Sequence, residues 1–82
     1  MPLRTTRSQV TFEAPFRLAE IDEAQLPGTY DIDTEEEILE GNERTVYLRV
    51  ATMIYLRTYS GVRTVTIDPK GLEAALTKDG PA

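Results

Sequence analysis

The stretch from Thr45 to Arg57 constrains this chain more than any other part of its sequence. Apolar side chains occupy alternate positions there and only Thr52 interrupts them: Val46, Leu48, Val50, Ile54 and Leu56. A period of two is typical of a β-strand with one apolar face. Some of these residues are also spaced four apart, as in a helix, but the content of β-branched residues and Tyr favours the strand. We therefore expect a small β-rich domain organised around this strand.

The length of this strand predicts an irregularity within it. At about 3.3 Å per residue it would span roughly 43 Å. A compact chain of 82 residues should have a radius of gyration of only about 12 Å. We expect the strand to bend or to carry a bulge near Ala51 and Thr52, where the apolar face is interrupted.

Other strands are predicted before it. Val10–Leu18 has apolar residues at even positions, and Pro15 makes it an edge strand or a bent one. The acidic segment 19–25 predicts a loop, and a Pro-Gly turn then leads into a strand over Thr29–Asp33. Thr34–Glu40 fits either a return strand or a single helical turn; the strand is favoured because one helical turn is marginal without strong packing.

The segment after the long strand predicts a hairpin. Ser60–Gly61 is typical of a two-residue turn. Such a turn places Leu56 opposite Val65. It also places Ile54 opposite Ile67, so two apolar pairs share the face already assigned to the core.

The last segment predicts a short helix over residues 68–79. Asp68 is a favourable N-cap, Pro69 suits the first helical position, and Gly80 can form the C-terminal cap. An apolar stripe can dock the helix on the sheet: Leu72, Ala75 and Leu76.

These elements predict one mainly β (α+β) domain: four to five antiparallel strands in a small bent sheet or partly open barrel, with one C-terminal helix. Residues 1–8 should be disordered, residues 9–67 should form the β core, and residues 68–79 the helix. The expected core is Val10, Phe12, Phe16, Leu18, Tyr30, Ile32, Val46, Leu48, Val50, Ile54, Leu56, Val65, Ile67, Leu72 and Leu76.

Composition argues against several function classes. The chain has no Cys and no His, so disulfides are excluded and zinc is nearly so. Asp31, Asp33 and Glu35 match the first ligands of a calcium loop, but Glu36 stands where that loop needs Gly and Asn42 where it needs Glu. No nucleophile–base pair or glycine-rich phosphate loop is present. We therefore expect no enzyme, no metal and no cofactor.

Charge is distributed unevenly along the chain. Residues 1–12 carry two Arg and no acid, residues 13–43 carry eleven acids and one Arg, and residues 44–82 carry six basic residues and three acids. The acidic middle would repel a phosphate backbone. The sequence shows no secretory signal and no apolar run long enough to cross a membrane, which favours a cytoplasmic protein.

The second face of the long strand is the candidate interaction surface. It carries residue types that are enriched at protein interfaces: Tyr47, Arg49, Met53, Tyr55 and Arg57. The predicted function is a non-catalytic interaction domain that binds a protein partner or forms a homodimer. Two alternatives remain: the helix or the loop could cover this face as a second core, or its tyrosines could stack single-stranded nucleic acid. The acidic segment argues against nucleic acid.

Three segments carry a resemblance: Pro15–Leu18, Leu26–Tyr30 and Thr34–Gly41. Together they resemble a group of short bacterial proteins of unknown function, in which a PF-x-L segment precedes a proline-glycine turn, a TY-x-[VI] strand and an acidic TEEE-type run. The resemblance covers about residues 12–55. It implies a bacterial origin and a stand-alone domain, and it implies no activity, cofactor or catalytic residue.

Overall fold

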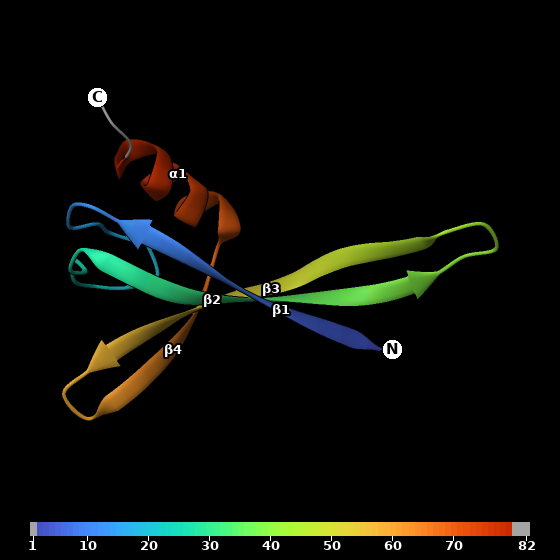
Figure 1. Ribbon diagram of the computed structural model, residues 1–82, viewed down its shortest axis with the longest axis horizontal. Helices are drawn as coiled ribbons and strands as arrows, with labels where there is room; N and C mark the ends of the chain where they lie inside the picture. Colours follow the sequence, from blue (N-terminus) through green and yellow to red (C-terminus); the bar gives the residue numbers. More distant parts are fainter. Residues whose placement is uncertain (1, 80–82) are drawn as a thin grey trace.

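The computed structural model describes residues 2–79 as one open sheet and one helix (Figure 1). Four antiparallel strands lie in chain order, β1 (Leu3–Phe12), β2 (Gly28–Glu40), β3 (Thr45–Thr58) and β4 (Gly61–Ile67), and α1 (Pro69–Asp79) follows them. The predicted fold class is confirmed, and the sheet remains unclosed. The strand predicted over Thr34–Glu40 is also confirmed, but it continues β2 without a break and is not a return strand.

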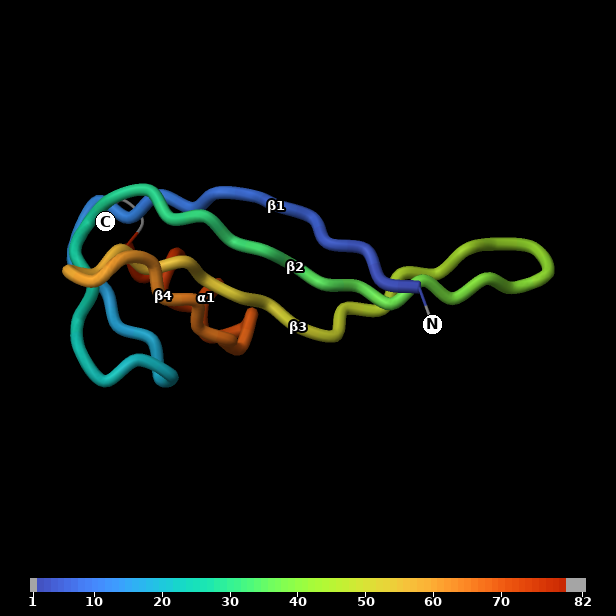
Figure 2. The backbone as a smooth tube through the Cα atoms, turned by 90° about the horizontal axis from the view of Figure 1, so that it is seen from below, coloured from blue at the N-terminus to red at the C-terminus, as the bar shows by residue number. Residues whose placement is uncertain are grey.

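The core lies on one face of the sheet, which we call the core face. Helix α1 and the connection 13–27 lie on the same side of the strands (Figure 2). Phe12 stacks on Phe16 with ring centroids 3.6 Å apart, and Tyr30 meets Phe16 edge-on at 5.2 Å. Ile21, expected in a loop, is only 3% exposed because that loop covers the sheet. The buried core comprises Phe12, Phe16, Leu18, Ile21, Ile32, Ile54, Leu56, Ile67 and Leu72.

Carboxylates fix the helix to this connection. The Asp68 carboxylate accepts the backbone N–H of Lys70 at 2.9 Å, which confirms the predicted N-cap. The Glu20 carboxylate accepts the N–H of Asp68 at 2.8 Å. At the other end, the Asp79 carboxylate accepts the N–H groups of residues 13 and 14 at 2.8 and 2.9 Å. The helix and the loop therefore form one layer; the predicted cap at Gly80 lies outside the described residues.

The start of the chain corrects two predictions. Leu3 to Ser8, expected to be disordered, form the first part of β1, which pairs with β2 from Leu3 opposite Glu37 to Phe12 opposite Gly28. The physical reason is charge complementarity, since the two arginines of β1 meet the acidic run of β2. The strand predicted over Val10–Leu18 is confirmed only in part: Val10 to Phe12 belong to β1, which is an edge strand, and the chain bends before Pro15.

The β3–β4 hairpin differs from the prediction by two residues. Thr58 lies opposite Gly61, so the turn is Tyr59–Ser60, and Gly61 takes a φ of 134° that favours glycine. Ile54 consequently pairs with Val65 rather than Ile67. A shift of two residues leaves every side chain on its predicted face, and for that reason the apolar pattern could not distinguish the two registers.

The β2–β3 pairing contains the predicted bulge. Glu35 lies opposite Ala51, whereas Glu36 lies opposite Arg49, so Val50 is an extra residue without a partner on β2. The bulge is one residue from the predicted position. Directly opposite residues share a face of the sheet. The extra residue therefore places the even-numbered residues of β3 before the bulge on the face opposite to that of the even-numbered residues after it.

This inversion removes three residues from the predicted core. Val46, Leu48 and Val50 are 44%, 52% and 49% exposed. They belong to the outer part of the β2–β3 hairpin, residues 36–50, which projects away from the helix and which we call the arm (Figure 1). The arm lengthens the molecule to 46 Å and raises its radius of gyration to 14.8 Å, above the value expected for a compact chain.

Candidate interaction surface

The face opposite the core, which we call the open face, carries a polar cluster near its centre. Arg7 on β1 donates two hydrogen bonds to the Asp33 carboxylate on β2, from Nε at 2.8 Å and from Nη2 at 3.1 Å. The Tyr55 hydroxyl on β3 donates a third at 2.7 Å, and the Arg7 guanidinium lies 4.8 Å from the centre of the Tyr55 ring. Asp33 is only 7% exposed, so these donors compensate a buried charge.

The hydrogen bonds in this cluster shift the protonation of both acidic groups. The hydrogen bond from Arg7, followed by that from Tyr55, lowers the pKa of Asp33 below its ordinary value. Donation to Asp33 raises the pKa of Tyr55. Asp33 is therefore ionised and Tyr55 neutral at neutral pH.

A second cluster of the same composition lies on the core face, at the base of the arm. Arg4 on β1 donates to Glu36 on β2, with Nη2 2.6 Å from Oε1, and its guanidinium lies 3.8 Å from the centre of the Tyr47 ring on β3. The hydrogen bond to Glu36 raises the pKa of Arg4. This cluster holds β1 against the arm.

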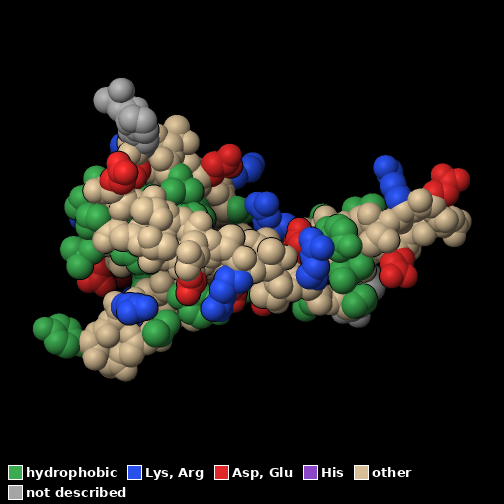
Figure 3. Space-filling view, viewed as in Figure 1, with side chains coloured by type: hydrophobic (Ala, Val, Ile, Leu, Met, Phe, Trp, Pro, Cys, Tyr) green, Lys and Arg blue, Asp and Glu red, His purple; other side chains and the backbone are tan. Residues whose placement is uncertain are grey.

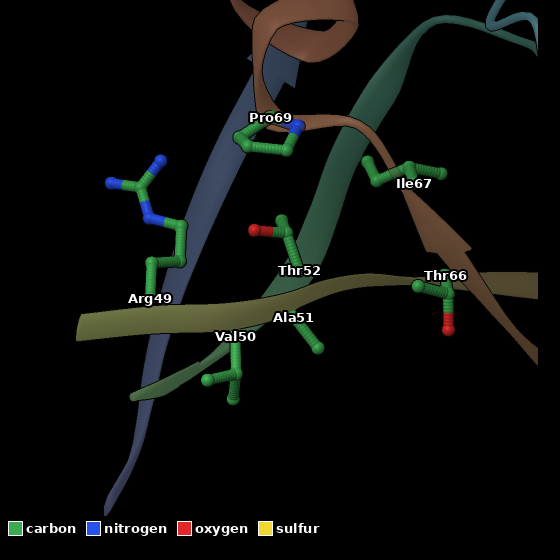
Figure 4. Close-up of a pocket in the computed structure, with 7 residues that line it drawn as sticks. All are labelled: Arg49, Val50, Ala51, Thr52, Thr66, Ile67 and Pro69. Carbon is green, nitrogen blue, oxygen red and sulfur yellow. The ribbon is translucent and has the colours of Figure 1, made fainter. Parts of the chain in front are cut away.

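The structure divides the predicted interaction surface between the two faces. Tyr47 and Arg49 point to the core side, whereas Met53, Tyr55 and Arg57 lie on the open face. The bulge separates the groups: Arg49 and Thr52 point to one side of β3, and Val50 and Ala51 to the other (Figure 4). The five residues predicted as one surface therefore do not form one. Tyr47 is 47% exposed, and Arg49 and Arg57 are exposed too, so the five residues do not form the second core that the helix or the loop was predicted to cover.

The open face of the arm carries apolar side chains instead. Leu3 and Leu48 flank Glu37 on either side, and Leu39 pairs with Val46. Leu3 is 58% exposed, similar to the exposed fractions of the β3 residues. Figure 3 shows hydrophobic side chains gathered on this projecting part of the molecule. We call this set the apolar patch: Leu3, Leu39, Val46, Leu48 and Val50.

The arm also has a free backbone edge. β4 ends at Ile67, opposite Thr52, so it covers only the later half of β3. No strand within residues 2–79 pairs with the outer edge of β3 over Thr45–Ala51. All residues from 41 to 50 are exposed. Exposed edges with apolar side chains are where sheets accept a further strand.

Two hollows lie near these features. A pocket of about 170 Å³ forms at the end of β4, lined by Arg49, Thr52 and Pro69 among others (Figure 4). The Thr52 hydroxyl there is buried and has no hydrogen-bond partner among the described residues. A wide, open groove of about 850 Å³ on the open face is lined by Arg7, Tyr55, Arg57 and the turn before β2.

Two polar side chains that line the groove bond to a neighbouring carboxylate. In the groove, Arg7 donates two hydrogen bonds to Asp33 and Tyr55 donates one. Within residues 2–79, no group of three or more acidic side chains is placed to hold a metal ion, and no helix is long and apolar enough to cross a membrane.

Comparison of the chain with protein-family models, with curated proteins and with solved structures finds no match. The resemblance to short bacterial proteins stays a prediction.

The sequence contained two signals for the residues that the interpretation missed. The opposite charges of residues 1–12 and 13–43 indicated that Arg4 and Arg7 could pair with the acidic strand. The length of the Thr45–Arg57 strand indicated that part of it must leave the core. Both signals lay in properties of whole segments and not in a local motif.

Proposed function

We propose that this chain is a non-catalytic interaction domain that self-associates through its arm. The observation that supports this most is the apolar patch on a projecting two-stranded ribbon, where Leu3, Val46, Leu48 and Val50 are each about half exposed or more. A two-stranded hairpin alone is marginally stable in water. Contact with a second chain would bury part of the patch and stabilise the ribbon.

The arrangement of the tyrosines disfavours nucleic acid. Stacking of bases needs uncovered aromatic faces in a basic groove. One face of the Tyr47 ring is occupied by Arg4 and the Tyr55 ring lies beside Arg7, and each arginine is paired with a carboxylate. The interaction surface is therefore proposed for protein and not for nucleic acid.

Sedimentation velocity tests this function. The monomer has a mass of 9.2 kDa, so a dimer sediments as a particle of twice that mass. We expect Leu48→Glu to weaken association by about thirtyfold or more, because it places two charges in the apolar contact. Val62→Glu is the matched control, since Val62 is 66% exposed on β4, away from the arm. A wild-type chain that remains monomeric at high micromolar concentration would refute the proposal.

A further inference from the structure

The direction of the backbone groups on the arm can be assigned from one hydrogen bond. The Gly41 N–H donates to the Arg44 carbonyl at 2.9 Å, which makes these two residues a hydrogen-bonded pair at the end of the hairpin. Hydrogen-bonded and non-hydrogen-bonded pairs alternate along an antiparallel ladder. Val46 and Leu48 therefore bond to β2, whereas Tyr47 points its N–H and C=O outward.

A second bond agrees with this assignment. Ile38 lies opposite Tyr47, and its N–H donates to the Pro2 carbonyl at 3.1 Å, on the side away from β3. Thr45, Tyr47 and Arg49 thus present donors and acceptors along the free edge. These groups are oriented to bond to a further strand.

We propose that the free edge of β3 pairs antiparallel with the same edge of a second copy, with the two-fold axis at Tyr47. This inference rests on the proposed self-association and specifies its geometry. Antiparallel pairing of a segment with itself is the symmetric arrangement of a two-fold dimer. It would join two four-stranded sheets into one continuous sheet.

The sequence of the edge is self-complementary in this register. Thr45 lies opposite Arg49 of the second copy, Val46 opposite its Leu48, and Tyr47 opposite its Tyr47. On the open face, the two Val46–Leu48 pairs bring four apolar side chains of the patch together. These are non-hydrogen-bonded pairs, in which the Cα atoms approach to about 4.5 Å and the side chains are closest.

The other face is electrically compatible with the same pairing. Each Tyr47 ring brings its own Arg4 toward the axis, and each Arg4 is already paired with Glu36 at 2.6 Å. Neutral arginine–carboxylate pairs can approach one another without the repulsion of two free cations.

The bulge disfavours the neighbouring register that has its two-fold axis one residue later in the strand. Thr45–Arg49 is the regular part of the edge, and with the axis at Tyr47 all five residues pair before Val50 is reached. An axis at Leu48 would bring Val50 into the ladder, and bulges interrupt pairing.

Cysteine cross-linking tests the register directly, because the natural chain has no Cys. A tagged Val46→Cys chain is mixed with an untagged Leu48→Cys chain under mild oxidation. We expect covalent heterodimers to form at least about tenfold faster than either variant cross-links with itself, since self-pairs would be diagonal neighbours about 7–8 Å apart. Val62→Cys measures the rate of random collision. Amide hydrogen exchange at Tyr47 and Arg49 should slow as concentration rises, and by a larger factor than exchange at Val46 and Leu48, whose N–H groups already bond to β2.

Each of the other outcomes contradicts a particular part of the proposal. Faster self-cross-linking of Leu48→Cys with rapid exchange at Tyr47 would show arms packed face to face, which overturns the edge pairing but leaves self-association intact. A non-covalent dimer without any cross-link above the Val62→Cys rate also overturns it. A wild type that sediments only as a monomer overturns the proposed function and this inference together.

Discussion

Ile54 and Leu48 provide a direct test of the inverted strand. Both are aliphatic residues at even positions of β3, so an uninterrupted alternation predicts the same burial for both. In the structure Ile54 is fully buried at 0% exposure, whereas Leu48 is 52% exposed. Truncation of each to Ala therefore has different expected costs.

The magnitudes follow from the exposed fractions. Replacing a buried Ile by Ala lowers the free energy of unfolding by about 2–5 kcal/mol. Truncating a half-exposed Leu removes little buried area and should lower it by less than about 1 kcal/mol. In a domain of this size each 1 kcal/mol changes the melting temperature by roughly 4–8 °C. Ile54→Ala should thus melt at least about 8 °C lower, and Leu48→Ala only a few degrees lower.

Urea and thermal unfolding monitored by circular dichroism measure both variants. Both variants should be measured at low micromolar concentration and again at tenfold higher concentration. Association through Leu48 would make the stability of the chain depend on concentration, and Leu48→Ala would weaken that dependence whereas Ile54→Ala would not. Equal destabilisation by both substitutions at the lower concentration would refute the bulge, since it would place Leu48 in the core.

Two further predictions concern the polar cluster and the bulge. Because the pKa of Asp33 is lower in the folded chain than in the unfolded one, its contribution to stability is present above pH of about 4 and is lost as the pH falls through the folded value. Tyr55→Phe removes one donor to Asp33, so the midpoint of acid unfolding should shift to higher pH, whereas Tyr59→Phe, at a fully exposed site, should leave it unchanged. Deletion of Val50 should keep the pairs on either side of it and alter the free energy of unfolding by no more than about 1 kcal/mol; loss of cooperative thermal unfolding would contradict this.

Much of the architecture follows from local patterns in the sequence. The long strand, the hairpin after it and the capped helix each have a period or a turn signal that acts over a few residues. The irregularity near Ala51 was predictable as well, because the strand was too long for a compact domain. These features depend on residues that are close together in the sequence, so one sequence is enough to predict them.

The interaction surface was not predictable in the same way. Its position depends on which residue becomes the bulge, and an error of one position transfers every later side chain to the opposite face. The charged start of the chain posed a similar problem: Arg4 and Arg7 lie in a mostly polar segment that by itself predicts disorder, and their carboxylate partners are 32 and 26 residues away in the sequence. Long-range pairing decides both features.

The two Arg–carboxylate–Tyr clusters show that the bulge is required by all three strands together. On β1 the arginines are three residues apart, and on β2 the carboxylates of Asp33 and Glu36 are also three apart, so each pair lies on opposite faces. On β3, however, Tyr47 and Tyr55 are eight residues apart and would share one face in a regular strand. The extra residue converts this even spacing into an odd one and lets each tyrosine meet its own arginine. The same residue turns Val46 and Leu48 outward, so the irregularity that completes the clusters also exposes the apolar patch of the arm.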